Sequence, residues 1–226
     1  MTLSTLSITE GLNERQIEVV KRTTGHLLVV AGPGSGKTLA IVRRISHLIQ
    51  QGVSPKSVLA VTFTNRAAKE MRERLFALMG ATLQEVFVGT LHLLGLRIIR
   101  ENTTDGFVVY SREEQVGLLK SLFQISKAKA MDFADKISYV KSLTVDPQDN
   151  LKEAFGQYQT AMVEQKALDF DDLILKPVEM LDNPKMHNKY RDSFRHIMID
   201  EYQDINPAQY RLLRLLAGDN ATVCAV

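Results

Sequence analysis

One short segment restricts the possible folds more than any other: residues 31–38 read AGPGSGKT. The segment follows an apolar run at residues 27–31 and precedes a helical pattern from Lys37 to about Gln51. Glycines between a strand and a helix let successive backbone N–H groups turn towards phosphate oxygens at the helix N-terminus. We therefore predict a phosphate-binding loop in an α/β fold. The alternative is a glycine-rich turn without a ligand.

The chemistry of such a loop assigns roles to its last residues. Lys37 would reach the β- and γ-phosphates of a nucleoside triphosphate, and the Thr38 hydroxyl would bind Mg²⁺. The expected cofactors are therefore a nucleoside triphosphate and Mg²⁺. Ala31 stands where the usual pattern has glycine, and an extended strand end should tolerate this change. The expected nucleotide-binding residues of the loop are Ala31, Gly32, Pro33, Gly34, Ser35, Gly36, Lys37 and Thr38.

A second segment places two carboxylates at the end of an apolar run: residues 196–201 read HIMIDE. Because ligands gather at the carboxyl ends of parallel strands, both acids can face the predicted loop. Asp200 would hold Mg²⁺, and Glu201 would orient and deprotonate the attacking water. Successive residues on a strand point to opposite faces, so this interpretation requires the strand to end at about Asp200. The alternative is a solvated acidic pair at a turn.

Strand-like and helical patterns alternate through the first hundred residues, which predicts a parallel sheet covered on both faces. From residue 109 to 189 we expect helices only, the first opened by a capping box of Ser111 and Glu114. The strand pattern returns at 196–200. The expected organisation is an α/β domain (1–108 and 190–226) with an all-helical insertion (109–189). Strands are expected at residues 27–31, 57–63, 86–89, 196–200 and 221–226, and helices from Lys37, Arg66, Thr90 and Pro207.

Composition excludes several classes of protein. With 226 residues, 45% hydrophobic and 24% charged, the chain can bury a core and is neither disordered nor fibrous. The net charge of +2 permits a nucleic-acid partner but does not argue for one. The single cysteine, Cys224, lies in an apolar run and is expected in a buried strand. Neither a long apolar stretch nor a signal-peptide pattern at residues 1–11 is found, so we expect a cytoplasmic protein.

Further segments narrow the class of the predicted nucleotide-binding protein. They are LNERQ at 12–16, TFTNRAA at 62–68, GTLH at 89–92, DFDDL at 169–173, and DEYQDIN at 200–206 with Gln209. These segments resemble the motifs of superfamily 1 DNA helicases of the UvrD/Rep/PcrA type. Residues 12–16, LNERQ, resemble the adenine-reading LNxxQ motif, in which Gln16 can pair with adenine through one donor and one acceptor. Together with the glycine-rich loop, the motifs follow the family's order over nearly the whole chain.

The resemblance implies a first RecA-like ATP-binding domain with a helical insertion. It also implies ATP hydrolysis coupled to 3′ to 5′ translocation on single-stranded DNA and to duplex unwinding, with no membrane partner. The expected partners are single-stranded and duplex DNA and a second RecA-like domain of the same chain. The acids Asp169, Asp171 and Asp172 are interpreted as structural, because they place negative charge at a helix start.

The resemblance also implies contacts with DNA, each of which has a structural alternative. Phe63 could stack on a base or belong to the core. Asn65 and Arg66 could contact a phosphate or cap a helix. His92 could touch DNA or cap local backbone. The residues expected to contact nucleic acid are Phe63, Thr64, Asn65, Arg66, Thr90 and His92.

The sequence departs from the family pattern at two positions. Leu39 stands where an arginine commonly packs beside the base, so adenine stacking is weaker here or supplied by another residue. Leu91 replaces a phenylalanine, which removes stacking at that point.

The sequence ends at Val226, where the family's next motif would begin. An arginine finger is worth roughly 10³ to 10⁵ in rate, so we expect little activity from the 226 residues alone. Three alternatives remain open. They are a subunit of a helicase–nuclease of the RecB/AddA type, a nucleotide-dependent binding module without catalysis, and an RNA helicase.

Overall fold

The computed structural model describes residues 8–226, with the side chain of Asn150 left aside. The chain forms two compact units. The first unit contains the residues up to Leu91, Pro184–Ile205 and Arg214–Val226. The second contains His92–Asn183 and Asn206–Leu213. The expected absence of a signal peptide rests partly on residues 1–7, which lie outside the described residues. The domain boundaries drawn at residues 109 and 189 stay a prediction.

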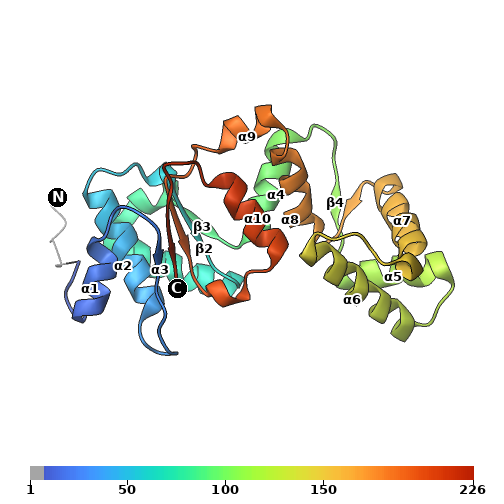
Figure 1. The fold of residues 1–226 in the computed structure, drawn as a ribbon, viewed down its shortest axis with the longest axis horizontal. Helices are drawn as coiled ribbons and strands as arrows, with labels where there is room; N and C mark the ends of the chain where they lie inside the picture. Colours follow the sequence, from blue (N-terminus) through green and yellow to red (C-terminus); the bar gives the residue numbers. More distant parts are fainter. Residues whose placement is uncertain (1–7) are drawn as a thin grey trace. The chain divides into compact units, whose positions relative to one another are not determined.

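The first unit is built on a five-stranded sheet, ordered β1-β7-β6-β2-β3, in which every neighbouring pair is parallel (Figure 1). The central strands carry uninterrupted apolar runs because a parallel sheet is buried on both faces. This arrangement confirms the predicted parallel α/β, RecA-like fold class. The strands are β1 (Leu27–Leu28), β2 (Val58–Val61), β3 (Phe87–Gly89), β6 (His196–Ile199) and β7 (Thr222–Ala225).

Helices α2 and α3 share one hydrophobic core with this sheet. Ile41 and Ile45 of α2 are fully buried against residues of β2 and α3, because apolar residues at helical spacing face the sheet. Cys224 of β7 belongs to the same core, as expected. The helical segments of this unit are α1 (Glu14–Lys21), α2 (Lys37–Gln50), η1 (Pro55–Ser57), α3 (Asn65–Met79), η2 (Gly80–Glu85), α9 (Pro184–Tyr190) and η3 (Tyr202–Asp204).

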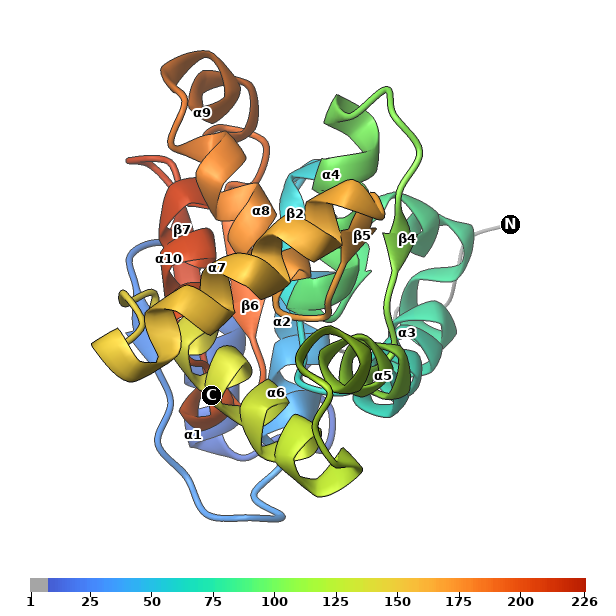
Figure 2. The same cartoon turned by 90° about the vertical axis from the view of Figure 1, so that its right-hand side faces the viewer.

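The second unit is mainly helical, but the expectation of helices alone between residues 109 and 189 is wrong. Strand β4 (Val108–Val109) pairs in parallel with β5 (Ala167–Leu168), and the two lie side by side in Figure 2. Two-residue strands are too short to show a period of two, so the pattern at 167–168 could not be distinguished from a helix end. The helices are α4 (Leu91–Asn102), α5 (Arg112–Phe123), α6 (Lys127–Leu143), α7 (Asp149–Glu164) and α8 (Asp172–Leu181). Helix α10 (Pro207–Leu216) belongs to the second unit up to Leu213.

The structure confirms one predicted element end and corrects another. The capping box of Ser111 and Glu114 opens α5 as predicted. Strand β1 is shorter than the predicted 27–31, because the chain leaves the sheet after Val29, whose N–H still donates to Ala225 O at 2.8 Å. Val30 is already 89% exposed. The glycine-rich loop therefore begins two residues earlier than the apolar run suggested.

A buried polar cluster holds the second unit together. Lys141 of α6 is 2% exposed, and its Nζ donates to Asp169 at 2.6 Å and to Asp172 at 2.8 Å. Tyr158 Oη also donates to Asp169, at 2.8 Å. The two aspartates cap the start of α8 reciprocally, since each backbone N–H donates to the other carboxylate at 3.0 Å. The expected helix-start role of these acids is thus accompanied by a buried lysine that sequence reasoning missed.

Protonation in this cluster follows from burial and charge. Burial would lower the pKa of Lys141, but the carboxylates of Asp172 and Asp169 hold it above its ordinary value. Burial would raise the pKa of Asp169, but Lys141 and Tyr158 hold it below the ordinary value. Burial raises the pKa of Asp172 to about 6. One lysine therefore compensates one carboxylate fully and the second only in part.

Candidate functional site

The glycine-rich loop joins the end of β1 to the start of α2, as its position in the sequence predicts. Gly34 and Gly36 have φ angles of 73° and 82°, which are values that residues with a side chain rarely adopt. Helix α2 then begins at Lys37, so its free N–H groups lie beside the loop. This is the geometry that binds anions at a helix N-terminus.

Lys37 is turned back onto the loop. Its Nζ donates to Ala31 O at 3.1 Å and to Gly32 O at 3.2 Å. These bonds to neutral carbonyls are weaker than bonds to an anion would be. The ammonium group can therefore exchange them for phosphate oxygens without first breaking an ion pair.

Thr38 and Asp200 are 162 residues apart in sequence and meet directly. The Thr38 hydroxyl donates to Asp200 Oδ2 at 2.9 Å. Asp200 is 3% exposed, and burial raises its pKa above the ordinary value. Its Oδ1 is buried without a hydrogen-bond partner among the described residues. An unpartnered carboxylate oxygen beside a hydroxyl fits the hard oxygen ligands that Mg²⁺ prefers, so the residues present fit the expected ion.

Glu201 faces the same loop because the strand ends before the acidic pair. Strand β6 stops at Ile199, and Glu201 adopts the left-handed region (φ 58°, ψ 51°), which breaks the alternation of side chains. This confirms that the strand ends at about Asp200. A non-glycine residue in this region costs roughly 1 kcal/mol or more. Gln203 Nε2 donates to Glu201 Oε2, which orients the carboxylate.

Gln16 is attached to the loop from a separate helix. It completes a capping box with Asn13 at the start of α1, in which Asn13 N–H donates to Gln16 Oε1 at 3.0 Å. Its Nε2 donates to Ser35 O at 2.9 Å. A Cβ atom on Gly36 would lie only 2.6 Å from this Nε2. Position 36 therefore requires glycine for its backbone angle, and a side chain there would also displace the flexible amide of Gln16 from the loop.

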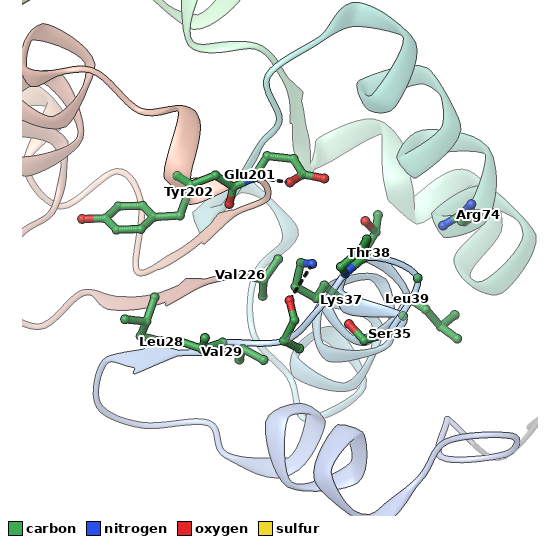
Figure 3. Close-up of a pocket in the computed structure, with 16 residues that line it drawn as sticks. Leu28, Val29, Ser35, Lys37, Thr38, Leu39, Arg74, Glu201, Tyr202 and Val226 are labelled. Atoms are coloured by element: carbon green, nitrogen blue, oxygen red, sulfur yellow. Dashed lines mark hydrogen bonds between the residues drawn. The ribbon is translucent and has the colours of Figure 1, made fainter.

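A pocket of about 740 Å³ lies over the loop, and all its lining residues belong to the first unit. Figure 3 shows Lys37 and Thr38 in its centre with Glu201 across from them. The polar lining residues that sequence reasoning did not assign to the site are Arg74, Tyr202 and Gln203. Arg74 comes from α3, in which the apolar residues of the sequence indicated only the buried face of the helix. The lining residues are Leu28, Val29, Val30, Ala31, Pro33, Gly34, Ser35, Gly36, Lys37, Thr38, Leu39, Arg74, Glu201, Tyr202, Gln203 and Val226.

The residues expected to contact DNA in the first unit lie at the end of β2 and the start of α3. Phe63 is 56% exposed, so the alternative that it belongs to the core is wrong. Thr64 caps α3, since its Oγ1 accepts from Ala67 N at 3.1 Å, and the helix begins at Asn65. Arg66 is exposed and pairs with Glu70 at 3.2 Å. Thr64, rather than Asn65 or Arg66, is therefore the N-cap residue of α3. The side chains of Asn65 and Arg66 are exposed at the surface.

The remaining two positions of that set are Thr90 and His92. Thr90 is the residue before α4 and is buried at 7% exposure. In the second unit, His92 stacks on Phe170, with ring centroids 4.1 Å apart and planes at 23°. Burial lowers the pKa of His92 to about 4, so the ring is neutral at neutral pH. A neutral, stacked imidazole offers a flat surface rather than a charge.

No helix within residues 8–226 combines the length and the apolar character that a membrane span requires.

Comparison with known proteins agrees with this arrangement. The family model described as UvrD/REP helicase N-terminal domain matches residues 12–226. The protein called ATP-dependent DNA helicase PcrA from Staphylococcus epidermidis is 34% identical over 243 residues, covering 97% of this chain and 33% of that protein. Its namesake from Staphylococcus aureus is 35% identical over 238 residues, covering 95% and 33%. The chain thus spans about a third of the length of these relatives. Its match to the family model over residues 12–226 shows that it belongs to the UvrD/REP helicase N-terminal domain family.

Proposed function

We propose that the 226 residues form the N-terminal ATP-binding region of an ATP-dependent DNA helicase. The whole helicase hydrolyses ATP to move 3′ to 5′ along single-stranded DNA and to unwind duplex DNA. The observation that carries the proposal is the hydrogen bond between Thr38 and Asp200, which joins the glycine-rich loop to the acidic strand end. The PcrA relatives are named as ATP-dependent DNA helicases, which supports the same reaction here.

Five polar side chains of the site have a defined task in this proposal. Lys37 leaves the carbonyls of Ala31 and Gly32 and binds the β- and γ-phosphates. Thr38 and Asp200 hold Mg²⁺ through the hydroxyl and the unpartnered Oδ1. Mg²⁺, when bound, neutralises charge on the phosphates. Glu201, oriented by Gln203, accepts the proton of the water that attacks the γ-phosphorus as the bond to ADP breaks.

The proposed DNA track uses the exposed residues at the end of β2. Phe63 offers a base-stacking surface, worth about 1–3 kcal/mol per base in other proteins. Asn65 and Arg66, at the N-terminus of α3, are placed to contact phosphate. Thr90 and His92 remain part of the proposed track. Bound DNA would then contact the segment between β2, a central strand of the sheet, and the start of α3.

The test uses a chimera in which these 226 residues replace the matched third of the Staphylococcus aureus relative. Single-stranded DNA should stimulate its ATP turnover. Glu201→Gln should lower the stimulated turnover by about 10²- to 10⁴-fold, because it removes the proton acceptor, while MgATP binding is retained. Glu85→Gln, an exposed position, is the matched control.

Two results would contradict the proposal. A chimera that binds MgATP but shows no DNA-stimulated turnover would favour a nucleotide-dependent binding module. In the 226-residue chain alone, Lys37→Ala should abolish MgATP binding measured by calorimetry. Equal affinity of Lys37→Ala and the unchanged chain would remove the nucleotide site itself from the proposal.

A further inference from the structure

The two ends of the pocket differ in chemistry. Figure 3 shows Leu28 and Tyr202 at one end and Ser35, Leu39 and Arg74 at the other, with Lys37 and Thr38 between them. Since Lys37 is proposed to bind the phosphates and Thr38 to hold the Mg²⁺ beside them, a bound nucleoside triphosphate must extend its base towards one of these ends.

Gln16 indicates which end receives the base. Its amide donates to Ser35 O at 2.9 Å, so the proposed adenine-reading side chain lies at the end with Ser35 and Leu39. Leu39 supplies apolar surface there but no charge and no hydrogen-bond donor. A base bound at this end would therefore lie against Leu39 and close to the other residues that line this end of the pocket.

Arg74 is the cationic side chain at that end. It comes from the third turn of α3 and lines the pocket with Leu39. It makes no hydrogen bond or ion pair with any residue between 8 and 226. Other cations of the same helix are engaged: Arg66 with Glu70, Lys69 with Glu73, and Arg72 with Val88 O. The guanidinium of Arg74 is therefore free to meet a ligand without losing a partner.

We propose that the Arg74 guanidinium packs over the face of the purine base of the bound nucleotide, opposite the apolar surface of Leu39. A planar guanidinium stacks well on aromatic rings and is attracted to their electron-rich face. Arg74 thereby supplies, from α3, the cation that position 39 does not provide. This inference rests on the proposed function, because it requires a nucleotide held by Lys37 and Thr38.

The test compares two ligands of the 226-residue chain by calorimetry with Mg²⁺ present: ATP, and inorganic tripolyphosphate, which has no base. Arg74→Ala should weaken ATP binding about threefold to tenfold and leave tripolyphosphate binding unchanged. Lys69→Ala, which removes an exposed cation from the same helix, should change neither. Circular dichroism checks that each variant is folded, which the exposure of Arg74 leads us to expect.

Relocating the charge gives a second readout. In the Arg74→Ala background, Leu39→Arg should restore ATP affinity without changing tripolyphosphate affinity. Equal effects of these variants on both ligands would mean that the charge acts on phosphates, and unchanged ATP affinity in Arg74→Ala would mean no contact; either result overturns the inference. If the unchanged chain binds ATP no better than Lys37→Ala, the proposed function fails instead.

Discussion

Asp200 in the first unit and Asp169 in the second are both almost fully buried, 3% and 2% exposed, yet their oxygens are used differently. Asp169 accepts from Lys141, Tyr158 and a backbone N–H, and its pKa is held low. Asp200 accepts from Thr38 through one oxygen and leaves the other unpartnered, and its pKa is raised. A satisfied buried carboxylate stabilises a fold, whereas an unsatisfied one beside an open pocket fits a ligand.

The largest expected effect tests the satisfied cluster. Lys141→Met keeps the length of the side chain but leaves two buried carboxylates without their cation, so the free energy of unfolding should fall by about 3–5 kcal/mol. Urea unfolding measures it. Lys136→Met on the same helix removes only an exposed pair with Asp132 and should cost less than about 1 kcal/mol. Similar losses in both variants would mean that the buried lysine contributes no more than a surface one.

A smaller effect concerns the pH dependence of the same cluster. Asp172 has a pKa of about 6 in the folded protein against an ordinary 3.8, so the folded state holds this proton more tightly than the unfolded chain. The resulting stability is fully present below about pH 3.8 and is lost as the pH rises through about 6. Between these limits the contribution of Asp172 to the unfolding free energy should fall by about 1–3 kcal/mol, while the lowered pKa of His92 acts in the opposite direction.

Asp172→Asn should remove this dependence. Urea unfolding of both proteins from pH 4 to 7.5 measures it, and the difference between them separates Asp172 from other titrating groups such as His92. Parallel pH profiles would contradict the raised pKa.

The smallest effect tests the unsatisfied carboxylate. Asp200→Asn removes a buried charge that nothing in the described residues compensates fully, so the unfolding free energy without nucleotide should stay equal or rise by up to about 1 kcal/mol. MgATP affinity should fall in the same variant. Asp204→Asn, on an exposed neighbouring residue, should change neither quantity. A clear loss of stability in Asp200→Asn would mean that Asp200, like Asp169, stabilises the fold.

The sequence predicted those parts of the fold and site that local patterns encode. The uninterrupted apolar runs before Thr62 and Asp200 identified the central strands, since a strand buried on both faces needs such runs. The glycine-rich loop and the acidic pair were recognised from residue type and context, and the structure joins them through Thr38 and Asp200.

What the sequence did not reveal depends on contacts between distant segments. Arg74 lines the pocket because α3 lies beside the start of α2, and no pattern within α3 marks that position. Lys141 had a signal that was not used: it falls on the same helical face as Ala134 and Ile137, both fully buried. Asn13 and Gln16 form a capping box with the spacing of Ser111 and Glu114, so Gln16 also had a local structural role that was overlooked.

The order of strands in the sheet has a consequence for how the protein is made. Strands β6 and β7 lie between β1 and β2, although both are synthesised more than a hundred residues after them. A chain leaving the ribosome thus presents the glycine-rich loop well before Asp200 exists to meet Thr38. Pairings between such distant segments form slowly and leave unpaired strand edges exposed meanwhile. The nucleotide pocket should therefore form only after β6 and β7 have been synthesised and have paired between β1 and β2.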